Sequence, residues 1–186
     1  MSGTLDVEAR EPRTVVEVEM EVPVAPRALG GPIAVLVMAL AGLGISAYLT
    51  AVHYAGVPLA CTAGSVVDCS AVTTSSYSVV PGTSVPVTVP GLLWFAVSAG
   101  LALVALRAEL EGAPASSRLA AAAVLWSAAG LVGVLYLVWA EAARLHRLCE
   151  WCTAAHLLVA ASLVVGLVRL QRVTLADRVT AADREG

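Results

Sequence analysis

Two signals coincide in the stretch LCEWCTAAHLLVAASLVVGLV, residues 148–168. The stretch is almost continuously apolar, and its length of about 20 residues is what an α-helix needs to cross the hydrocarbon core of a bilayer. Its first residues contain two thiols, Cys149 and Cys152, in a Cys-x-x-Cys pair. The stretch therefore predicts a transmembrane helix that carries a reactive dithiol at one end.

Three earlier stretches have the same apolar character, and they cover Gly30–Val52, Val85–Leu106 and Leu119–Ala140. Apolar residue types make up 59% of the chain and charged types only 13%, whereas soluble domains carry about a quarter charged residues. The mean hydropathy is +0.84. We therefore predict an all-α membrane protein, with a four-helix transmembrane bundle over residues 28–170 and a long extracytoplasmic loop between its first two helices.

The two ends of the chain are polar. Residues 1–27 are rich in Glu and predict a disordered cytoplasmic leader, and residues 171–186 predict a cytoplasmic tail. The first apolar stretch is too long for a signal-peptide core and follows an acidic leader rather than a basic one, so we expect it to stay as a membrane anchor. The net charge of −3 provides no basic surface for nucleic acid.

The arginines predict the orientation of the bundle. Four spans put both termini on one side, and that side would hold nine of the eleven Arg, leaving only Arg144 and Arg147 on the other. Positive residues accumulate on the cytoplasmic side, so both termini are predicted to be cytoplasmic. Segments 53–84 and 141–148, which carry or adjoin all four Cys, then face the oxidising exterior. The absence of Lys beside abundant Ala and Val is typical of a GC-rich bacterial genome, so we expect a bacterial plasma membrane.

The position of Cys149 at a helix start favours an active thiol. A helix N-terminus stabilises a thiolate; Arg147 adds to this effect and Glu150 opposes it. We expect a reactive thiolate at the membrane surface. A disulfide that only staples these four residues would add little stability, because it closes a very short loop.

Zinc binding is an alternative for the same segment. His146, Cys149, Cys152 and His156 have spacings that zinc sites use. However, His156 would lie a full turn inside the membrane, and Glu150 would be the only acidic group available to support the ligands. We therefore expect no metal.

Cys61 and Cys69 lie in the long loop, and alone they could form a structural disulfide. A second pair on the same side instead suggests a relay, in which thiol–disulfide exchange carries oxidation from one pair to the other. A relay needs a final electron acceptor, and a dithiol at a helix end beside lipid favours a membrane quinone held between the helices. The competing reading is a structural four-span membrane protein with a stapled outer loop.

These residues together resemble the vitamin K epoxide reductase family, including its bacterial disulfide-forming members. The resemblance covers roughly residues 30–170. It rests on the Cys61-x7-Cys69 pair, on Ser75 six residues later, on the four spans, and on Cys149-x-x-Cys152 opening the last span. The segment Val85-Pro86-Val87 that leads into Gly91-Leu92-Leu93 is similar to the family's entry into the second helix.

The resemblance implies a role for each of these residues. Cys152 is the thiol nearest the quinone and forms the adduct or charge-transfer contact with it. Cys149 exchanges with the loop through Cys69, and Cys61 meets the external thiol partner. Ser75 lies beside the quinone and supports it by hydrogen bonding. The partner is expected to be a separate thioredoxin-fold protein on the outer face, because the chain has no room for the fused domain that many bacterial members carry.

Two positions depart from the vertebrate members of the family. His156 stands where these have a Tyr that faces the ring, and Tyr77 stands where they have a Trp. His156 could donate to a quinone oxygen, or it could pack against a neighbouring backbone carbonyl. Both changes favour reduction of a quinone, menaquinone or ubiquinone, over reduction of an epoxide. We therefore expect Ser75, His156 and Tyr77 to bind the quinone.

Overall fold

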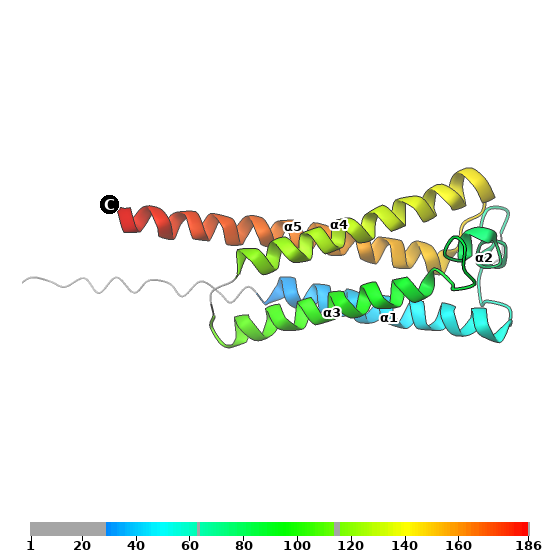
Figure 1. Cartoon of the computed structure of the whole chain (residues 1–186), viewed down its shortest axis with the longest axis horizontal. Helices are drawn as coiled ribbons and strands as arrows, with labels where there is room; N and C mark the ends of the chain where they lie inside the picture. Colours follow the sequence, from blue (N-terminus) through cyan, green and yellow to red (C-terminus); the bar gives the residue numbers. More distant parts are fainter. Residues whose placement is uncertain (1–28, 63, 114–115, 186) are drawn as a thin grey trace, which may run out of the picture.

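The computed structural model describes residues 29–62, 64–113 and 116–185. Its four long helices are α1 (Gly30–Ala55), α3 (Thr88–Leu110), α4 (Ser117–Trp139) and α5 (Glu150–Glu185). They run side by side as an elongated bundle (Figure 1). Each is long and apolar enough to cross a membrane, α4 together with the turn that follows it. The predicted all-α, four-helix membrane fold is confirmed, and the predicted leader, 1–27, lies outside the described residues.

Three short elements complete the chain: α2 (Cys69–Thr73), the 3-10 turn η1 (Ser76–Ser78) and the π-helical turn η2 (Ala140–Leu145). Helix α4 thus continues through η2 into the segment 141–148, where we predicted a tight turn. Likewise, α5 continues to Glu185, through the segment where we predicted only a tail. A fall in hydropathy marks where a helix leaves the hydrocarbon core of the bilayer. The helix itself continues beyond that point where residues with high helix propensity, such as Ala, Arg and Gln, follow.

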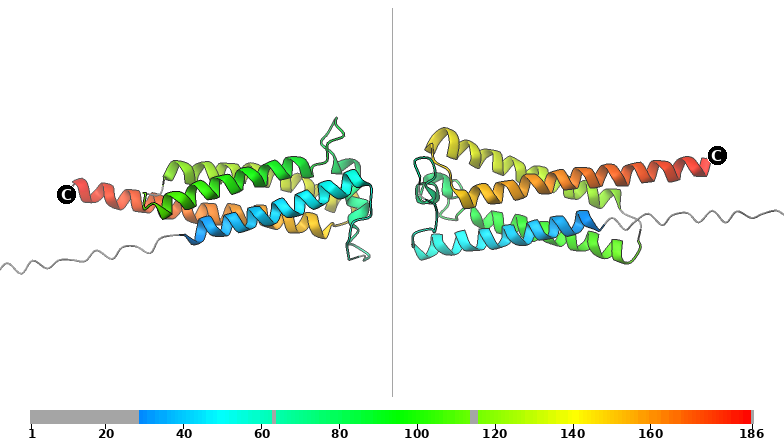
Figure 2. Two further views of the ribbon diagram at one scale, coloured as in Figure 1. Left: turned by 90° about the horizontal axis from the view of Figure 1, so that it is seen from below. Right: turned by 180° about the vertical axis from the view of Figure 1, so that it is seen from behind.

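The bundle has two distinct ends (Figures 1 and 2). The terminal end, as we call it, is where α1 begins and where α5 extends past the other helices. The loop end carries residues 56–62, 64–87 and 140–152, and therefore all four Cys. Helix α1 finishes there at Gly56, which adopts a left-handed conformation with φ 64° and donates its N–H to the Val52 carbonyl. Such a cap suits glycine.

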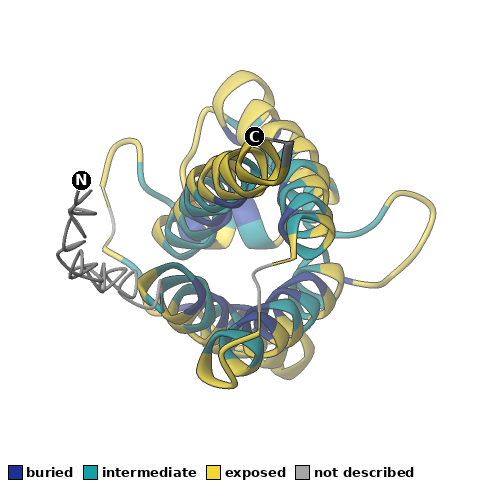
Figure 3. Cartoon of the chain, turned by 90° about the vertical axis from the view of Figure 1, so that its left-hand side faces the viewer, coloured by how far each residue is buried: buried dark blue, intermediate teal, exposed yellow. Residues whose placement is uncertain are grey.

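Small residues make the helix contacts. The buried residues of the bundle include Ala39, Ala102 and Ala105, together with three buried serines of α3, α4 and α5, namely Ser98, Ser127 and Ser162. Long apolar residues such as Leu125 (72% exposed) and Leu157 (65% exposed) are left uncovered by the rest of the protein. The ribbon in Figure 3 is coloured as exposed mainly on the outside of the ring of helices. This distribution is the one expected when lipid surrounds the bundle.

A pair of tryptophans braces α3 against α4. The indole N–H of Trp94 donates to the Trp126 carbonyl at 3.2 Å, and the indole N–H of Trp126 donates to the Trp94 carbonyl at 3.3 Å and to the Ser98 hydroxyl at 3.2 Å. Gly130 of α4 lies against this tryptophan pair, and a Cβ at its position would overlap the Trp94 ring. Glycine is therefore required there for the helices to approach.

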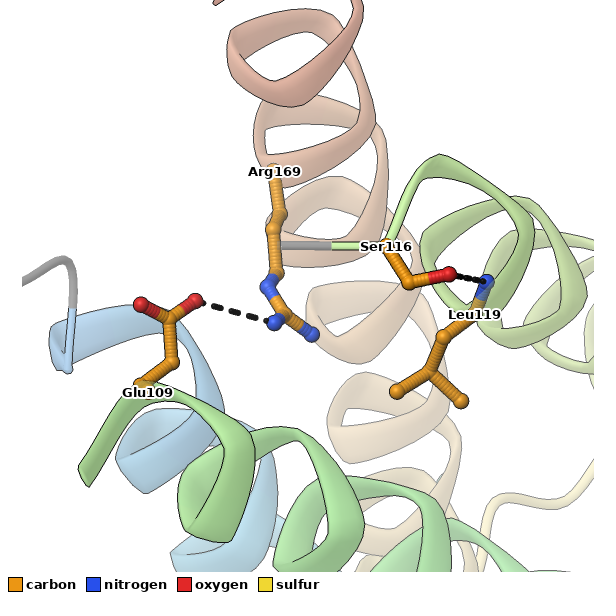
Figure 4. Close-up of polar contacts among 4 residues, drawn as sticks. All are labelled: Glu109, Ser116, Leu119 and Arg169. Atoms are coloured by element: carbon orange, nitrogen blue, oxygen red, sulfur yellow. Dashed lines mark hydrogen bonds and ion pairs between the residues drawn. The ribbon is translucent and has the colours of Figure 1, made fainter. Parts of the chain in front are cut away.

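The terminal end is held by a polar contact between α3 and α5. Arg169 pairs with Glu109 at 3.1 Å, and both side chains are mostly buried (Figure 4). Nearby, the Ser116 hydroxyl accepts from the Leu119 N–H at 3.3 Å and caps the start of α4 (Figure 4).

Candidate functional site

The two cysteine pairs are in different redox states. Cys61 and Cys69 form a disulfide, whereas Cys149 and Cys152 are free thiols. Cys69 (1% exposed) and Cys149 (0% exposed) belong to the same buried cluster at the loop end, against which Cys61 and Cys152 also pack. The fold therefore brings together the four cysteines that were predicted from the sequence.

A short β-bridge joins the segments that carry the pairs. Val67 and Leu148 form a parallel bridge, in which the Asp68 N–H donates to the Leu148 carbonyl and the Leu148 N–H donates to the Val66 carbonyl, both at 3.0 Å. Cys69 directly follows Asp68, and Cys149 directly follows Leu148. The bridge thus fixes the backbone immediately before one cysteine of each pair.

The two residues between Cys149 and Cys152 hold the loop on both sides of Cys61. The Trp151 indole N–H donates to the Ala60 carbonyl at 2.7 Å. The Glu150 carboxylate accepts from the Thr62 N–H at 3.1 Å and also from its hydroxyl. The middle of the Cys-x-x-Cys motif therefore positions the partly exposed cysteine of the other pair.

Cys149 sits just before the first residue of α5, where its sulfur accepts from the Cys152 N–H at 3.3 Å. A hydrogen bond from the Cys152 side chain is the main reason that the pKa of Cys149 is lowered, while burial and the Glu141 carboxylate oppose it. Cys149 is fully buried, so the expected thiolate is covered by protein rather than open to solvent. Arg147 instead donates to the Ser65 carbonyl at 3.0 Å.

A cavity of about 380 Å³ lies between the four long helices on the inner side of the thiol pair. This volume falls within the range of small-molecule sites. Cys152 and His156 of α5 face it, and most of the other lining residues are apolar or small: Leu49, Pro90, Gly91, Trp94, Phe95, Gly130, Gly133, Val134, Leu137 and Val159 among them. A flat, largely apolar ring suits such a lining.

Ser75 and Tyr77 line a second, smaller cavity of about 40 Å³, which Cys152 and His156 also line. The Ser75 hydroxyl donates to the Val72 carbonyl at 2.7 Å and accepts from the Tyr77 N–H at 3.3 Å, so it shapes the 3-10 turn. The Tyr77 hydroxyl accepts from the Arg144 Nε at 3.0 Å. The predicted quinone-binding residues are thus neighbours, but His156 alone of the three faces the larger cavity as well.

His156 was predicted either to face a ring or to pack against a backbone carbonyl. Its side chain is partly buried and lines both cavities. No hydrogen bond joins it to another residue in the described part of the chain. The arrangement therefore leaves its ring available to a bound molecule.

Possible metal ligands cluster elsewhere than predicted. In residues 29–62, 64–113 and 116–185, one group of three possible metal-binding side chains has its ligand atoms within 4.8 Å of one another. It consists of Cys61, Cys69 and Glu150. Its two sulfurs are joined in the disulfide, which removes both thiolates as ligands. The alternative zinc set of His146, Cys149, Cys152 and His156 is not gathered in this way.

Sequence reasoning missed three residues of the site: Glu141, Glu150 in its contact with Thr62, and Trp151 in its contact with Ala60. Glu141 is 4% exposed, and its carboxylate accepts from the Cys149 N–H at 3.4 Å. In the sequence it is the first charge after the apolar run Leu119–Ala140, which is typical of the end of a membrane span. Its position eight residues before Cys149 could have indicated the contact only if the π-helical turn between them had been known.

The chain matches the model of a known protein family. The model of the vitamin K epoxide reductase family matches residues 33–167, which include α3 and α4, most of α1, the first half of α5 and both cysteine pairs. A search of curated proteins gave no match. Membership of this family implies an integral membrane oxidoreductase, in agreement with the four apolar helices and the paired cysteines. The chain therefore belongs to the vitamin K epoxide reductase family.

Proposed function

We propose that this protein is a thiol:quinone oxidoreductase that supports disulfide bond formation. One observation carries the proposal: the free thiols Cys149 and Cys152 lie between the Cys61–Cys69 disulfide on one side and an apolar cavity on the other. The cavity fits a quinone ring, because its lining is mainly apolar and its polar groups include a thiol and an imidazole.

The outer pair would receive electrons from a thioredoxin-fold partner. A partner thiolate attacks Cys61, which is more exposed than Cys69, and a second partner thiol completes the reduction of the Cys61–Cys69 bond. Cys69 then attacks Cys149 of an oxidised Cys149–Cys152 pair, and Cys61 resolves the mixed disulfide. Two electrons move inward, and the result is an oxidised outer pair with a reduced inner pair, as in the structure.

The inner pair would then reduce the quinone. Closing the Cys149–Cys152 bond releases two electrons and two protons, and a bound quinone, menaquinone or ubiquinone, takes up both to become a quinol. Cys152 lines the cavity and makes the contact, and His156 donates a hydrogen bond to a ring oxygen. Ser75 and Tyr77 support the edge of the site from the smaller cavity. The loop over the thiols keeps water away from them.

The arginines support an orientation with the site outside. Among the described residues, six Arg lie toward the terminal end (Arg107, Arg118, Arg169, Arg172, Arg178 and Arg184), and two lie at the loop end (Arg144 and Arg147). By the positive-inside rule, both termini are cytoplasmic and the cysteines face the exterior of a bacterial plasma membrane.

Thiol trapping separates this function from a structural role. The reduced protein is incubated with or without quinone, quenched in acid and alkylated, and the modified cysteines are counted by mass. The proposed function requires Cys149 and Cys152 to become protected only when quinone is present. If the redox state of all four cysteines is the same with and without quinone, the protein is a four-span structural protein with a stapled loop.

A further inference from the structure

Glu141 is a buried acid that the proposed function does not yet use. It is 4% exposed and is the only buried acidic side chain among the described residues. In the same part of the chain the only ion pair joins Arg169 to Glu109, at the opposite end. The two nearby arginines are bonded to neutral oxygens, Arg144 to the Tyr77 hydroxyl and Arg147 to the Ser65 carbonyl.

A charged carboxylate in such a place costs stability, because it is removed from water without a cation to compensate, and taking up a proton relieves that cost. Ionisable residues inside membrane proteins commonly mark routes for protons. Glu141 also lies in the π-helical turn η2, and such turns are frequent at functional sites.

The surroundings of Glu141 connect both thiols. Its Oε2 accepts from the Cys149 N–H at 3.4 Å. The same side chain lines the cavity of about 40 Å³ together with Cys152, His156 and Tyr77. A volume of this size has room for one water molecule.

The chemistry of the thiol pair needs a proton acceptor at this point. When Cys149 and Cys152 form a disulfide, both S–H bonds are lost, and two protons must leave with the two electrons. The Cys149 thiol is fully buried, so its proton has no direct path to bulk water. The quinone must in turn gain two protons to become a quinol.

We propose that Glu141 is the proton-transfer residue of the buried thiol pair: as Cys149 and Cys152 close into a disulfide, its carboxylate receives the Cys149 proton and passes it through the small cavity toward His156 and the reduced quinone. The Cys152 proton passes to the quinone directly in the larger cavity, which Cys152 lines. This inference rests on the proposed function. The titratable and charged groups around the carboxylate are Cys149 before α5, Cys152 and His156 on α5, Tyr77 on η1 and Arg144 on η2 itself.

The decisive variant is Glu141→Gln. The amide oxygen of Gln can still accept from the Cys149 N–H, so the local structure is retained while proton transfer is lost. Quinol formation should fall by about 100-fold or more, the usual contribution of an acid–base group. Glu111→Gln makes the same chemical change at an exposed position of the terminal end and should leave turnover unchanged.

A second readout needs no quinone. Infrared difference spectra between the dithiol and disulfide forms of the whole protein should show a carboxyl C=O band. When a small disulfide oxidises the thiols and no quinone is bound, the proton has no acceptor beyond Glu141 and stays on its carboxyl group. The band should be present in wild type and in Glu111→Gln, and absent in Glu141→Gln.

Wild-type turnover in Glu141→Gln would overturn the inference and reduce Glu141 to a hydrogen-bond acceptor. A wild-type spectrum without the band would also overturn it, even if Glu141→Gln were inactive or failed to fold. If wild type reduces no quinone at all, the proposed function fails. The infrared band then still decides whether Glu141 exchanges a proton with the thiols.

Discussion

Val67 and Leu148 pair across a parallel β-bridge that ties the loop to the start of α5, and each stands one or two residues before a cysteine of a different pair. Through this bridge, two cysteines that are 80 positions apart in sequence, Cys69 and Cys149, share one buried cluster. The proposed relay would depend on how firmly the loop is held against α5, and this can be tested at the contacts around Cys61.

Trp151→Phe should slow electron transfer between the two pairs. The change removes the indole hydrogen bond to the Ala60 carbonyl but keeps an aromatic ring beside Tyr48, which lies 5.1 Å away between ring centroids. A net hydrogen bond contributes about 1 kcal/mol, so we expect a loss of about five-fold in rate. Rapid acid quench and alkylation after adding a dithiol measures how fast Cys149 and Cys152 become reduced.

Trp139→Phe is the matched control for that variant. Trp139 lies at the same end of the bundle, is 49% exposed, and packs against the Tyr77 ring and the Arg144 guanidinium rather than against the loop around Cys61. Its rate of transfer should match wild type. Equal rates in all three proteins would show that the contact with Ala60 does not position Cys61.

The pH dependence of Cys149 should change when Cys152 is removed. The hydrogen bond from the Cys152 side chain is the largest cause of the lowered pKa of Cys149. A lower pKa means more thiolate at neutral pH; therefore Cys152→Ala should raise the pKa and shift the alkylation profile of Cys149 to higher pH. Alkylation rates with a small neutral reagent over a pH series give the profile. An unchanged or downward shift would contradict this electrostatic description.

Gly130→Ala should destabilise the bundle. A Cβ at this position overlaps the Trp94 ring, which is fixed by its bond to the Trp126 carbonyl. Overpacking of this kind costs about 1–3 kcal/mol, and thermal unfolding in detergent should show a lower Tm. Gly133→Ala on the same helix is the control, since a Cβ at this position would meet no neighbouring atom within 4 Å. It should be neutral or stabilise by up to about 1 kcal/mol.

Glu109→Gln should weaken the terminal end of the bundle. The exposed fractions of the Arg169 and Glu109 side chains are 17% and 13%, so the variant leaves a mostly buried guanidinium without its counter-charge. A cost of about 1–3 kcal/mol is expected, between the values for exposed and fully buried pairs. Thermal unfolding of Glu109→Gln beside Glu111→Gln, an exposed neighbour on the chain, measures it. Equal stability of the two variants would show that the ion pair contributes nothing.

Much of this fold could be predicted from the sequence because membrane spans leave a strong, local signal. The four apolar runs gave four helices, and the Cys spacing identified both pairs. Continuation of α4 into η2 and of α5 to Glu185 was missed, since hydropathy reports the lipid phase rather than helix ends. The contacts of Glu141, Glu150 and Trp151 were also missed. They depend on a loop folding back over α5, and such long-range pairing leaves no periodic pattern in the sequence.

Reduction of quinone by the purified protein tests the central claim most directly. The protein in detergent is given a small dithiol and a quinone, and quinol formation is followed for wild type, Cys152→Ala and Cys61→Ala. The relay predicts turnover in wild type, none in Cys152→Ala, and retained turnover in Cys61→Ala, because a small dithiol can reach the inner pair without the loop disulfide. No turnover with any quinone, or undiminished turnover in Cys152→Ala, would contradict it.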